Sequence, residues 1–197
     1  MNRILILFAH PAFQKSRVNK VLIQDIDKID AVTFRDLYQI YPEFDIDVAS
    51  EQQLLLAHDV IIFHHPFFWY STPAILKEWQ DLVLRHGWAY GSQGRSLKNK
   101  IFLSVVTSGG HREAYCKEGH NNFTVRQLLA PLEQTARLCK MIYLPPFVVH
   151  GTHSITPDKV RYHKSNYEKL MLLLRDDRID LKKAQPLLYL NDYLEKL

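Results

Sequence analysis

Cysteine is scarce in this chain of 197 residues, and the sequence signals of secretion and membrane insertion are missing. Its two cysteines, Cys116 and Cys139, predict neither a disulfide framework nor a metal site. No signal peptide is recognisable, and the apolar run at residues 4–9 is too short to cross a bilayer. We therefore expect a cytoplasmic protein.

The chain also has no large excess of positive or negative charge. The chain has 25 Lys and Arg against 21 Asp and Glu, a net charge of +4, and no basic run of the kind that binds nucleic acid. A mild positive potential still favours anionic ligands. The length predicts one domain over residues 1–197, ending in an amphipathic helical tail from about residue 175 that docks on the body or on a partner.

Five apolar runs are interleaved with helical patterns along the chain. The runs predict strands at residues 4–9, 31–36, 59–65, 101–108 and 141–149. Helical spacing of apolar residues covers 18–29, a stretch from the N-cap Thr72 to Gly87, 124–139 with a kink at Pro131, and 158–174. Pro145 and Pro146 predict that the fifth strand lies at an edge of the sheet or that a strand ends there. Such alternation predicts an α/β fold with a parallel sheet covered by helices on both faces.

Ligands of such sheets bind beyond the carboxyl ends of the strands, so the loops after the first, third and fourth strands are the candidates. The first loop, residues 9–19, lacks both the phosphate-loop and the dinucleotide-binding glycine motifs. Lys15 and Ser16 stand where a helix begins and predict an anion site. Taken alone, the loop favours a simpler role for Ser16 as an N-cap, and His10 is equally compatible with a hydrogen-bonded core position.

The second loop carries four consecutive aromatic residues, Phe67, Phe68, Trp69 and Tyr70. They cannot all face the interior, so some must line a cleft or a subunit interface, where a planar ligand would use their faces. The preceding His64 and His65 are neighbours on a strand and point to opposite faces, which argues against a metal site.

The third loop, residues 107–122, contains Gly109 and Gly110, whose N–H groups can stabilise an anion. Tyr115 and His120 follow and can exchange protons or hydrogen bonds, although a plain surface loop with a Gly-Gly turn would read similarly. Together the three loops match the parts of flavin mononucleotide (FMN), which are a phosphate, a planar ring, and a ring edge that becomes negative on reduction.

Five sequence motifs carry a family resemblance that extends from residue 4 to about residue 150. They are "AHP" with "SRVN", "RDLYQIYPEFDID", "HPFFWYSTPAILKEWQDLVLRHGWAYG", "TSGG" and "YLPPF". The chain resembles the flavodoxin-like NAD(P)H:quinone oxidoreductases of the DT-diaphorase superfamily. It is most similar to the small bacterial branch of general stress proteins and ancillary subunits of glutathione-gated potassium efflux systems. The resemblance implies a flavodoxin-like three-layer sandwich with a five-stranded parallel sheet in the order 2-1-3-4-5, and a homodimer with flavin sites near the interface.

The resemblance also implies roles for single residues. The positions that match the flavin phosphate and ribityl loop are His10, Ser16, Arg17, Val18 and Asn19. Those that match the segment along the flavin ring are Pro66, Phe67, Phe68, Trp69 and Tyr70. Those that match the loop at the pyrimidine side are Thr107, Ser108, Gly109 and Gly110. Tyr115 and His120 resemble the pair that supports hydride transfer, with one residue fewer between them than in the mammalian enzymes.

The function implied is ping-pong hydride transfer from NAD(P)H to a quinone. FMN is the expected cofactor because no motif binds an adenosine, with FAD as the alternative. A second hypothesis is a regulatory flavin-binding subunit of a potassium efflux transporter, held at the inner face of the membrane. A third is a flavin-binding redox sensor without fast turnover.

Overall fold

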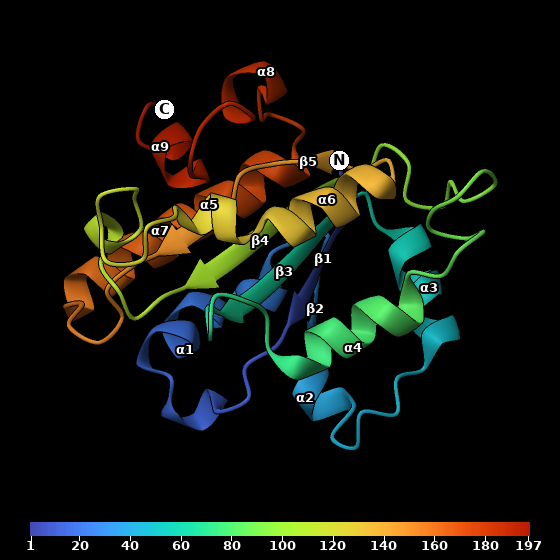
Figure 1. Cartoon of the computed structure of the whole chain (residues 1–197), viewed down its shortest axis with the longest axis horizontal. Coiled ribbons are helices and arrows are strands. Elements are labelled where there is room, and N and C mark those ends of the chain that lie inside the picture. The colour runs from blue at the N-terminus through green and yellow to red at the C-terminus, as the bar shows by residue number, and fades with distance from the viewer.

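The computed structural model describes all 197 residues, and it places a parallel β-sheet between two layers of helices (Figure 1). The sheet order is β2-β1-β3-β4-β5, and a further short strand, β6, also pairs with β4. The strands are β1 (Ile4–Phe8), β2 (Val32–Asp36), β3 (Val60–Pro66), β4 (Ile101–Thr107), β5 (Ile142–Tyr143) and β6 (Phe147–Val149). All strand pairs are parallel, so the predicted α/β class and the strand order 2-1-3-4-5 are confirmed.

The edge of the sheet next to β4 differs from the prediction of one continuous strand over residues 141–149. β5 pairs with the start of β4 at Ile101 and Phe102, and β6 pairs with its end. Between them lie Leu144, Pro145 and Pro146, and the prolines have no N–H with which to continue the ladder. The prediction of an edge position is confirmed, and the double proline divides the strand into two.

Helices cover both faces of the sheet (Figure 1). One face carries α1 (Arg17–Ile23), α7 (Pro157–Arg175), α8 (Leu181–Ala184) and α9 (Leu190–Leu194). The other face carries α2 (Leu37–Ile40), α3 (Val48–Ala57), α4 (Ala74–Val83), α5 (Val125–Leu128) and α6 (Ala130–Leu138). Short 3₁₀ turns are η1 (Phe13–Lys15), η2 (Ile26–Lys28) and η3 (Arg112–Ala114). No helix combines the length and apolar character needed to span a membrane.

Strand β1 shows why a central strand of this sheet is a continuous apolar stretch in the sequence. Leu5 and Leu7 belong to the core on the α3, α4 and α6 side, whereas Ile4 and Ile6 belong to the core on the α1 and α7 side. Successive side chains of a strand point to opposite faces, and both faces are buried. Both faces of β1 therefore need apolar residues, and all five of its positions carry them.

Several helix boundaries differ from the sequence-based expectation. Helix α4 begins at Ala74 with Pro73 as its N-cap residue, so the prediction of Thr72 as the cap is wrong. It ends at Val83, and Gly87, with φ +79°, belongs to the turn that follows. The predicted helix over residues 18–29 ends at Ile23, and the helix predicted to kink at Pro131 is two helices, α5 and α6. The sequence reading missed α2 and α3.

The C-terminal tail docks on the body of the same chain. Helix α9 contacts α7 and β6, and its Leu190 and Leu194 are buried in the core on the α7 side. The tail thereby extends the helical layer on that face.

Candidate active site

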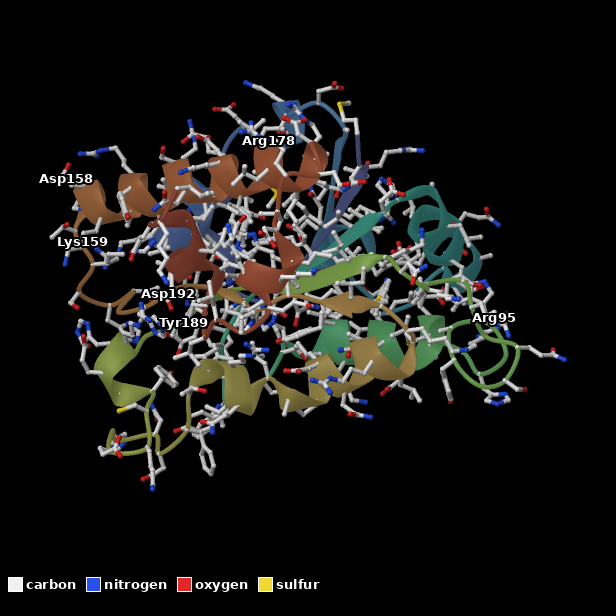
Figure 2. The ribbon with its side chains drawn as sticks, turned by 90° about the horizontal axis from the view of Figure 1, so that it is seen from above. Arg95, Asp158, Lys159, Arg178, Tyr189 and Asp192 are labelled. Atoms are coloured by element: carbon white, nitrogen blue, oxygen red, sulfur yellow. The ribbon has the colours of Figure 1, made fainter.

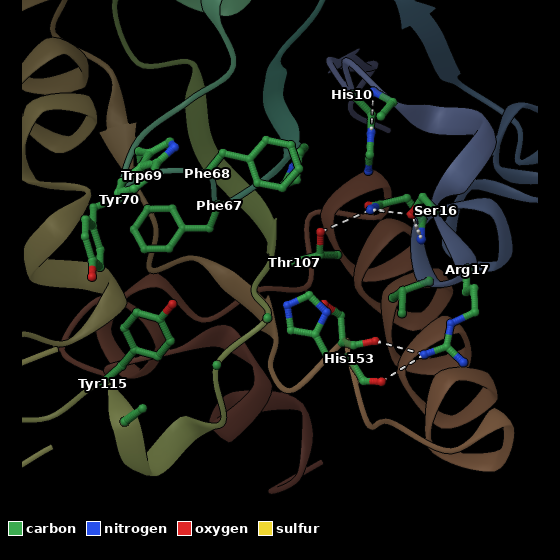
Figure 3. Close-up of a pocket in the computed structure, with 18 of the residues that line it drawn as sticks. His10, Ser16, Arg17, Phe67, Phe68, Trp69, Tyr70, Thr107, Tyr115 and His153 are labelled. Atoms are coloured by element: carbon green, nitrogen blue, oxygen red, sulfur yellow. Dashed lines mark hydrogen bonds between the residues drawn. The ribbon is translucent and has the colours of Figure 1, made fainter. Parts of the chain in front are cut away.

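A cavity of about 740 Å³ opens at the carboxyl ends of β1, β3 and β4, where the three candidate loops meet (Figure 3). This is the switch point of the sheet, because the chain passes from β1 to β2 on one side and to β3 on the other. The predicted site residues that line the cavity are His10, Ser16, Arg17, Val18, Asn19, Pro66, Phe67, Phe68, Trp69, Tyr70, Thr107, Gly109, Gly110, Tyr115 and His120. Of the predicted set, only Ser108 lies outside the lining.

The first loop is fixed by the start of α1. Ser16 is the N-cap residue, and its Oγ accepts from the Asn19 backbone N–H at 3.0 Å. The Asn19 side-chain amide donates to Ser16 Oγ at 3.0 Å and to Thr107 Oγ1 at 3.1 Å. Asn19 therefore ties the first loop to the end of β4. Ser16 caps the helix, as its sequence position suggested, and it also lines the cavity.

Behind Asn19 lies a second buried contact. His64 Nε2 is 3.0 Å from Asn19 Oδ1, and the Tyr167 hydroxyl is 3.3 Å from His64 Nδ1. Burial lowers the pKa of His64 to about 3, so the ring is neutral at physiological pH. Its Nε2–H then donates to Asn19, whose oxygen and amide are both engaged by protein groups. Asn19 thus links Ser16, Thr107 and His64 and holds this wall of the cavity in place.

The polar end of the cavity is positively charged. Lys15 and Arg17 are its charged lining residues, and no carboxylate lines it. His10 Nδ1 accepts from the Ala12 N–H at 3.2 Å, so the neutral ring carries its proton on Nε2. Burial lowers the pKa of His10, which favours this neutral form. This end of the cavity combines two cations with hydroxyl and imidazole donors, a set suited to an anion such as phosphate.

The second loop divides its aromatic residues between core and cavity. Phe67 is buried at 7% exposure, whereas Phe68 and Tyr70 are about half exposed and Trp69 is 93% exposed. Trp69 and Tyr70 have φ values of 50° and 62°, in the left-handed region that non-glycine residues rarely adopt. The expectation that these four residues cannot all face inward is confirmed. Backbone strain of this kind is typical of functional loops.

The third loop supplies two free backbone donors. The N–H groups of Gly109 and Gly110 donate to no other group of the protein. Ser108 lies beneath them, where its hydroxyl donates to Gly110 O at 3.0 Å and its backbone N–H to Val149 O at 2.9 Å. Ser108 thus supports the loop from behind, which explains why it does not reach the cavity.

Tyr115 is buried at the side of the cavity opposite the first loop (Figure 3). Its ring lies 6.1 Å from that of Phe67 and 5.6 Å from that of His150, measured between centroids. Burial raises the pKa of Tyr115 further above neutral pH, and its protonated hydroxyl can donate a hydrogen bond. His120 lies at the exposed rim, and its side chain makes no hydrogen bond within the protein.

The sequence reading missed a fourth wall, which follows β6. Thr152 and His153 line the cavity, and their carbonyl oxygens accept from Arg17 Nη2 at 3.3 and 3.1 Å. A Cβ on Gly109 would lie 2.3 Å from His153 Nε2, so a larger residue would displace this imidazole from its present position. The signal that could have found this wall is the carboxyl end of the fifth strand, which reaches the same sheet edge.

Comparisons with known proteins agree with this geometry. Residues 2–171 match the model of a family described as having a flavodoxin-like fold. The glutathione-regulated potassium-efflux system ancillary protein KefG of Pectobacterium carotovorum is 46% identical over 156 residues, which cover 79% of this chain and 85% of that protein.

Two solved structures are similar over most of their length. General stress protein 14 of Treponema denticola, in complex with FMN, has a TM-score of 0.80 and 33% identity, covering 90% of this chain and 99% of that one. An NADPH-quinone reductase from P. pentosaceus has a TM-score of 0.78 and 33% identity, covering 85% of this chain and 96% of that one. The chain therefore belongs to the flavodoxin-like fold family that its sequence motifs resemble.

Proposed function

We propose that this protein is an FMN-dependent NAD(P)H:quinone oxidoreductase. The observation that carries the proposal is one cavity that joins a cationic, hydroxyl-bearing end, an aromatic wall and two unpaired backbone N–H groups. Its volume of about 740 Å³ lies within the usual range for cofactor sites. The FMN complex of general stress protein 14 and the NADPH-quinone reductase, each 33% identical to this chain, support the assignment.

The residues of the cavity fit FMN part by part. Ser16, His10 and Lys15 would hold the phosphate, chiefly through side chains, because α1 has only seven residues and a small dipole. Phe67 and its aromatic neighbours would flank the ring and keep water away from it. The N–H groups of Gly109 and Gly110 would face the pyrimidine edge.

The chemistry that a flavin would supply here is transfer of a hydride from NAD(P)H to a quinone, which becomes a hydroquinone on taking up a proton from solvent. The protein's contribution is to place donors where negative charge develops. The Gly109 and Gly110 N–H groups are fixed before the reaction, so they need no reorganisation to stabilise that charge. The Tyr115 hydroxyl adds a further donor. His120, at the rim, is placed to contact the substrate.

The first test is flavin binding. We expect the purified protein to take up FMN at one per chain, with the absorbance bands of a bound flavin, and to bind FAD more weakly. Ser16→Ala should weaken FMN binding about tenfold because it removes a hydroxyl donor to a charged group. The matched control is Thr124→Ala, which removes the N-cap of α5 outside the cavity. A protein that gains no flavin absorbance with either FMN or FAD would refute the proposal.

Steady-state oxidation of NAD(P)H with a simple quinone then separates an enzyme from a redox sensor. Turnover at several per second or more is expected of an enzyme of ordinary efficiency. Flavin uptake without turnover would favour the sensor.

A second candidate function is that of an ancillary subunit for a potassium efflux system. It is favoured by the 46% identity to KefG over 85% of that protein. Co-purification of the tagged chain with the potassium efflux transporter of its own cell would support it, and the same flavin site would serve both functions.

We also propose a homodimer that forms at the mouth of the cavity. Phe68, Trp69 and Tyr70 are exposed there, and the Tyr70 hydroxyl donates to Asn121 at 3.1 Å, which holds the segment bearing the exposed Phe123 against the second loop. Exposed aromatic clusters of this kind usually mark interfaces. Sedimentation equilibrium at micromolar concentration should give a dimer mass.

A single substitution tests the position of this interface. Trp69→Ser should shift the equilibrium toward monomer, whereas Leu138→Ser, at an exposed apolar residue of α6, should not. A wild-type monomer at micromolar concentration would contradict the dimer.

A further inference from the structure

The C-terminal strap, residues 187–194, lies beyond the part of the chain that matches the family model, which ends at residue 171. Two hydrogen bonds join it to the edge strand β6, and a third joins it to Pro146, the residue before that strand. Asn191 Oδ1 accepts from the Val148 N–H at 2.8 Å, its Nδ2 donates to Val148 O at 3.1 Å, and the Leu190 N–H donates to Pro146 O at 3.0 Å. These contacts provide hydrogen-bond partners for the outward-facing backbone groups of Val148, and they fix the position of the strap along β6.

From this position, side chains of the strap contact Arg112 in the third loop of the cavity. Asp192 forms a two-pronged ion pair with Arg112, with nitrogen–oxygen distances of 2.8 and 3.0 Å. The Arg112 guanidinium also lies 4.9 Å from the centre of the Tyr189 ring. Figure 2 shows Tyr189 and Asp192 together at the end of the molecule where α7 begins. Arg112 opens η3, the turn that leads directly into Tyr115.

Three neighbouring rings, those of Tyr189, His150 and Tyr115, make a second connection between the strap and the cavity. The His150 ring lies 5.4 Å from Tyr189 on one side and 5.6 Å from Tyr115 on the other. His150 Nδ1 is 3.2 Å from Ser108 Oγ, whose own proton goes to Gly110 O, so His150 is the donor. Burial lowers the pKa of His150 to about 4, which keeps the ring neutral. His150 thus supports both Tyr115 and the glycine loop from behind.

We propose that the C-terminal strap is a positioning element for Tyr115. Asp192 holds η3 through Arg112, and Tyr189 holds the Tyr115 ring through His150, so that the hydroxyl stays directed at the cavity. The strap acts on Tyr115 through these two intermediaries, Arg112 and His150. The role given to Tyr115 rests on the proposed function.

Hydrogen exchange in the cofactor-free protein tests directly whether the strap holds η3 in place. The amides of Ala114 and Tyr115 donate within η3 to His111 O and Arg112 O, so their exchange reports opening of the turn. Asp192→Asn should speed their exchange about five- to tenfold, the factor expected for loss of a partly exposed bidentate pair. Tyr189→Leu should act in the same direction. Tyr189→Phe, which keeps the ring, and Glu43→Gln, at an exposed carboxylate outside the strap that forms no ion pair, should match the wild type.

The functional readout uses the FMN-loaded protein. In Asp192→Asn, flavin reduction by NAD(P)H should slow about fivefold with FMN affinity unchanged, because a displaced donor lowers the rate without loosening the phosphate end. Unchanged exchange at Ala114 and Tyr115 in both Asp192→Asn and Tyr189→Leu would overturn the proposal. So would faster exchange spread equally over β1 and β4, since that would mean general destabilisation. If the wild type bound no flavin, the proposed function would fail while the exchange result still decided the role of the strap.

Discussion

Replacing Glu51 with alanine is expected to lower the free energy of unfolding by about 3–5 kcal/mol, the usual cost of removing one partner of a buried ion pair. Glu51 is fully buried. Its Oε1 accepts from the Tyr41 hydroxyl at 2.7 Å and from Arg35 Nη2 at 2.5 Å, and its Oε2 accepts from Trp79 Nε1 at 2.9 Å. One carboxylate therefore joins α3 to β2, to the turn after α2, and to α4.

The size of the effect follows from what remains after the substitution. Arg35 would keep a largely buried charge without its counterion, and the Tyr41 hydroxyl and the Trp79 indole would lose their acceptor. Chemical denaturation followed by tryptophan fluorescence and circular dichroism measures the change. Glu51→Gln keeps the shape and some of the hydrogen bonds, so it should cost less than Glu51→Ala.

The control is Glu78→Ala, at an exposed carboxylate of α4, which should change the free energy of unfolding by less than about 0.5 kcal/mol. A loss below about 1 kcal/mol in Glu51→Ala would show that water or a neighbour replaces the carboxylate. The network would then contribute little to holding α3 in place.

The same residue explains why α3 could not be found from an apolar stripe. The buried positions of α3 are Glu51 and Leu55, and Leu56 is exposed, so the apolar pattern points the wrong way. The signal that was present is the N-cap, because Asp47 accepts from the Ser50 N–H at 3.0 Å. Helices α4 and α7 were predictable because their buried residues are apolar and lie at helical spacing.

The sheet was predictable for the opposite reason. Its central strands are buried on both faces and consist mainly of apolar residues, and their alternation with helices determines a parallel order. The division of the fifth strand could be read only in part. Pro145 and Pro146 signalled an edge, but which ladder bonds would be lost depends on the register with β4, a tertiary property.

The site was predictable where strand ends carry unusual residues. Four aromatics and a Gly-Gly pair stand out in a sequence, and they do line the cavity. Thr152 and His153 do not stand out, and they were missed because they follow a strand whose end was not considered. Ser108 shows the converse limit, since sequence adjacency to Gly109 does not reveal that its side chain points away from the cavity.

Tyr115→Phe should slow flavin reduction by NAD(P)H by roughly ten- to a hundredfold while leaving FMN affinity nearly unchanged. A hydrogen bond to developing charge contributes about 1.5–3 kcal/mol, and each 1.36 kcal/mol is tenfold in rate. The substitution removes only the hydroxyl, because a phenylalanine ring retains the contacts with Phe67 and His150. Binding should survive because the first and second loops supply most of the remaining lining.

Stopped-flow absorbance of the FMN-loaded protein measures this rate, and equilibrium titration measures the FMN dissociation constant. Tyr162→Phe, at an exposed tyrosine of α7 outside the cavity, is the matched control and should reduce its flavin at the wild-type rate. A wild-type rate in Tyr115→Phe with full flavin occupancy would remove Tyr115 from the catalytic assignment. Stabilisation of the developing charge would then fall to the N–H groups of Gly109 and Gly110, which no side-chain substitution at Tyr115 removes.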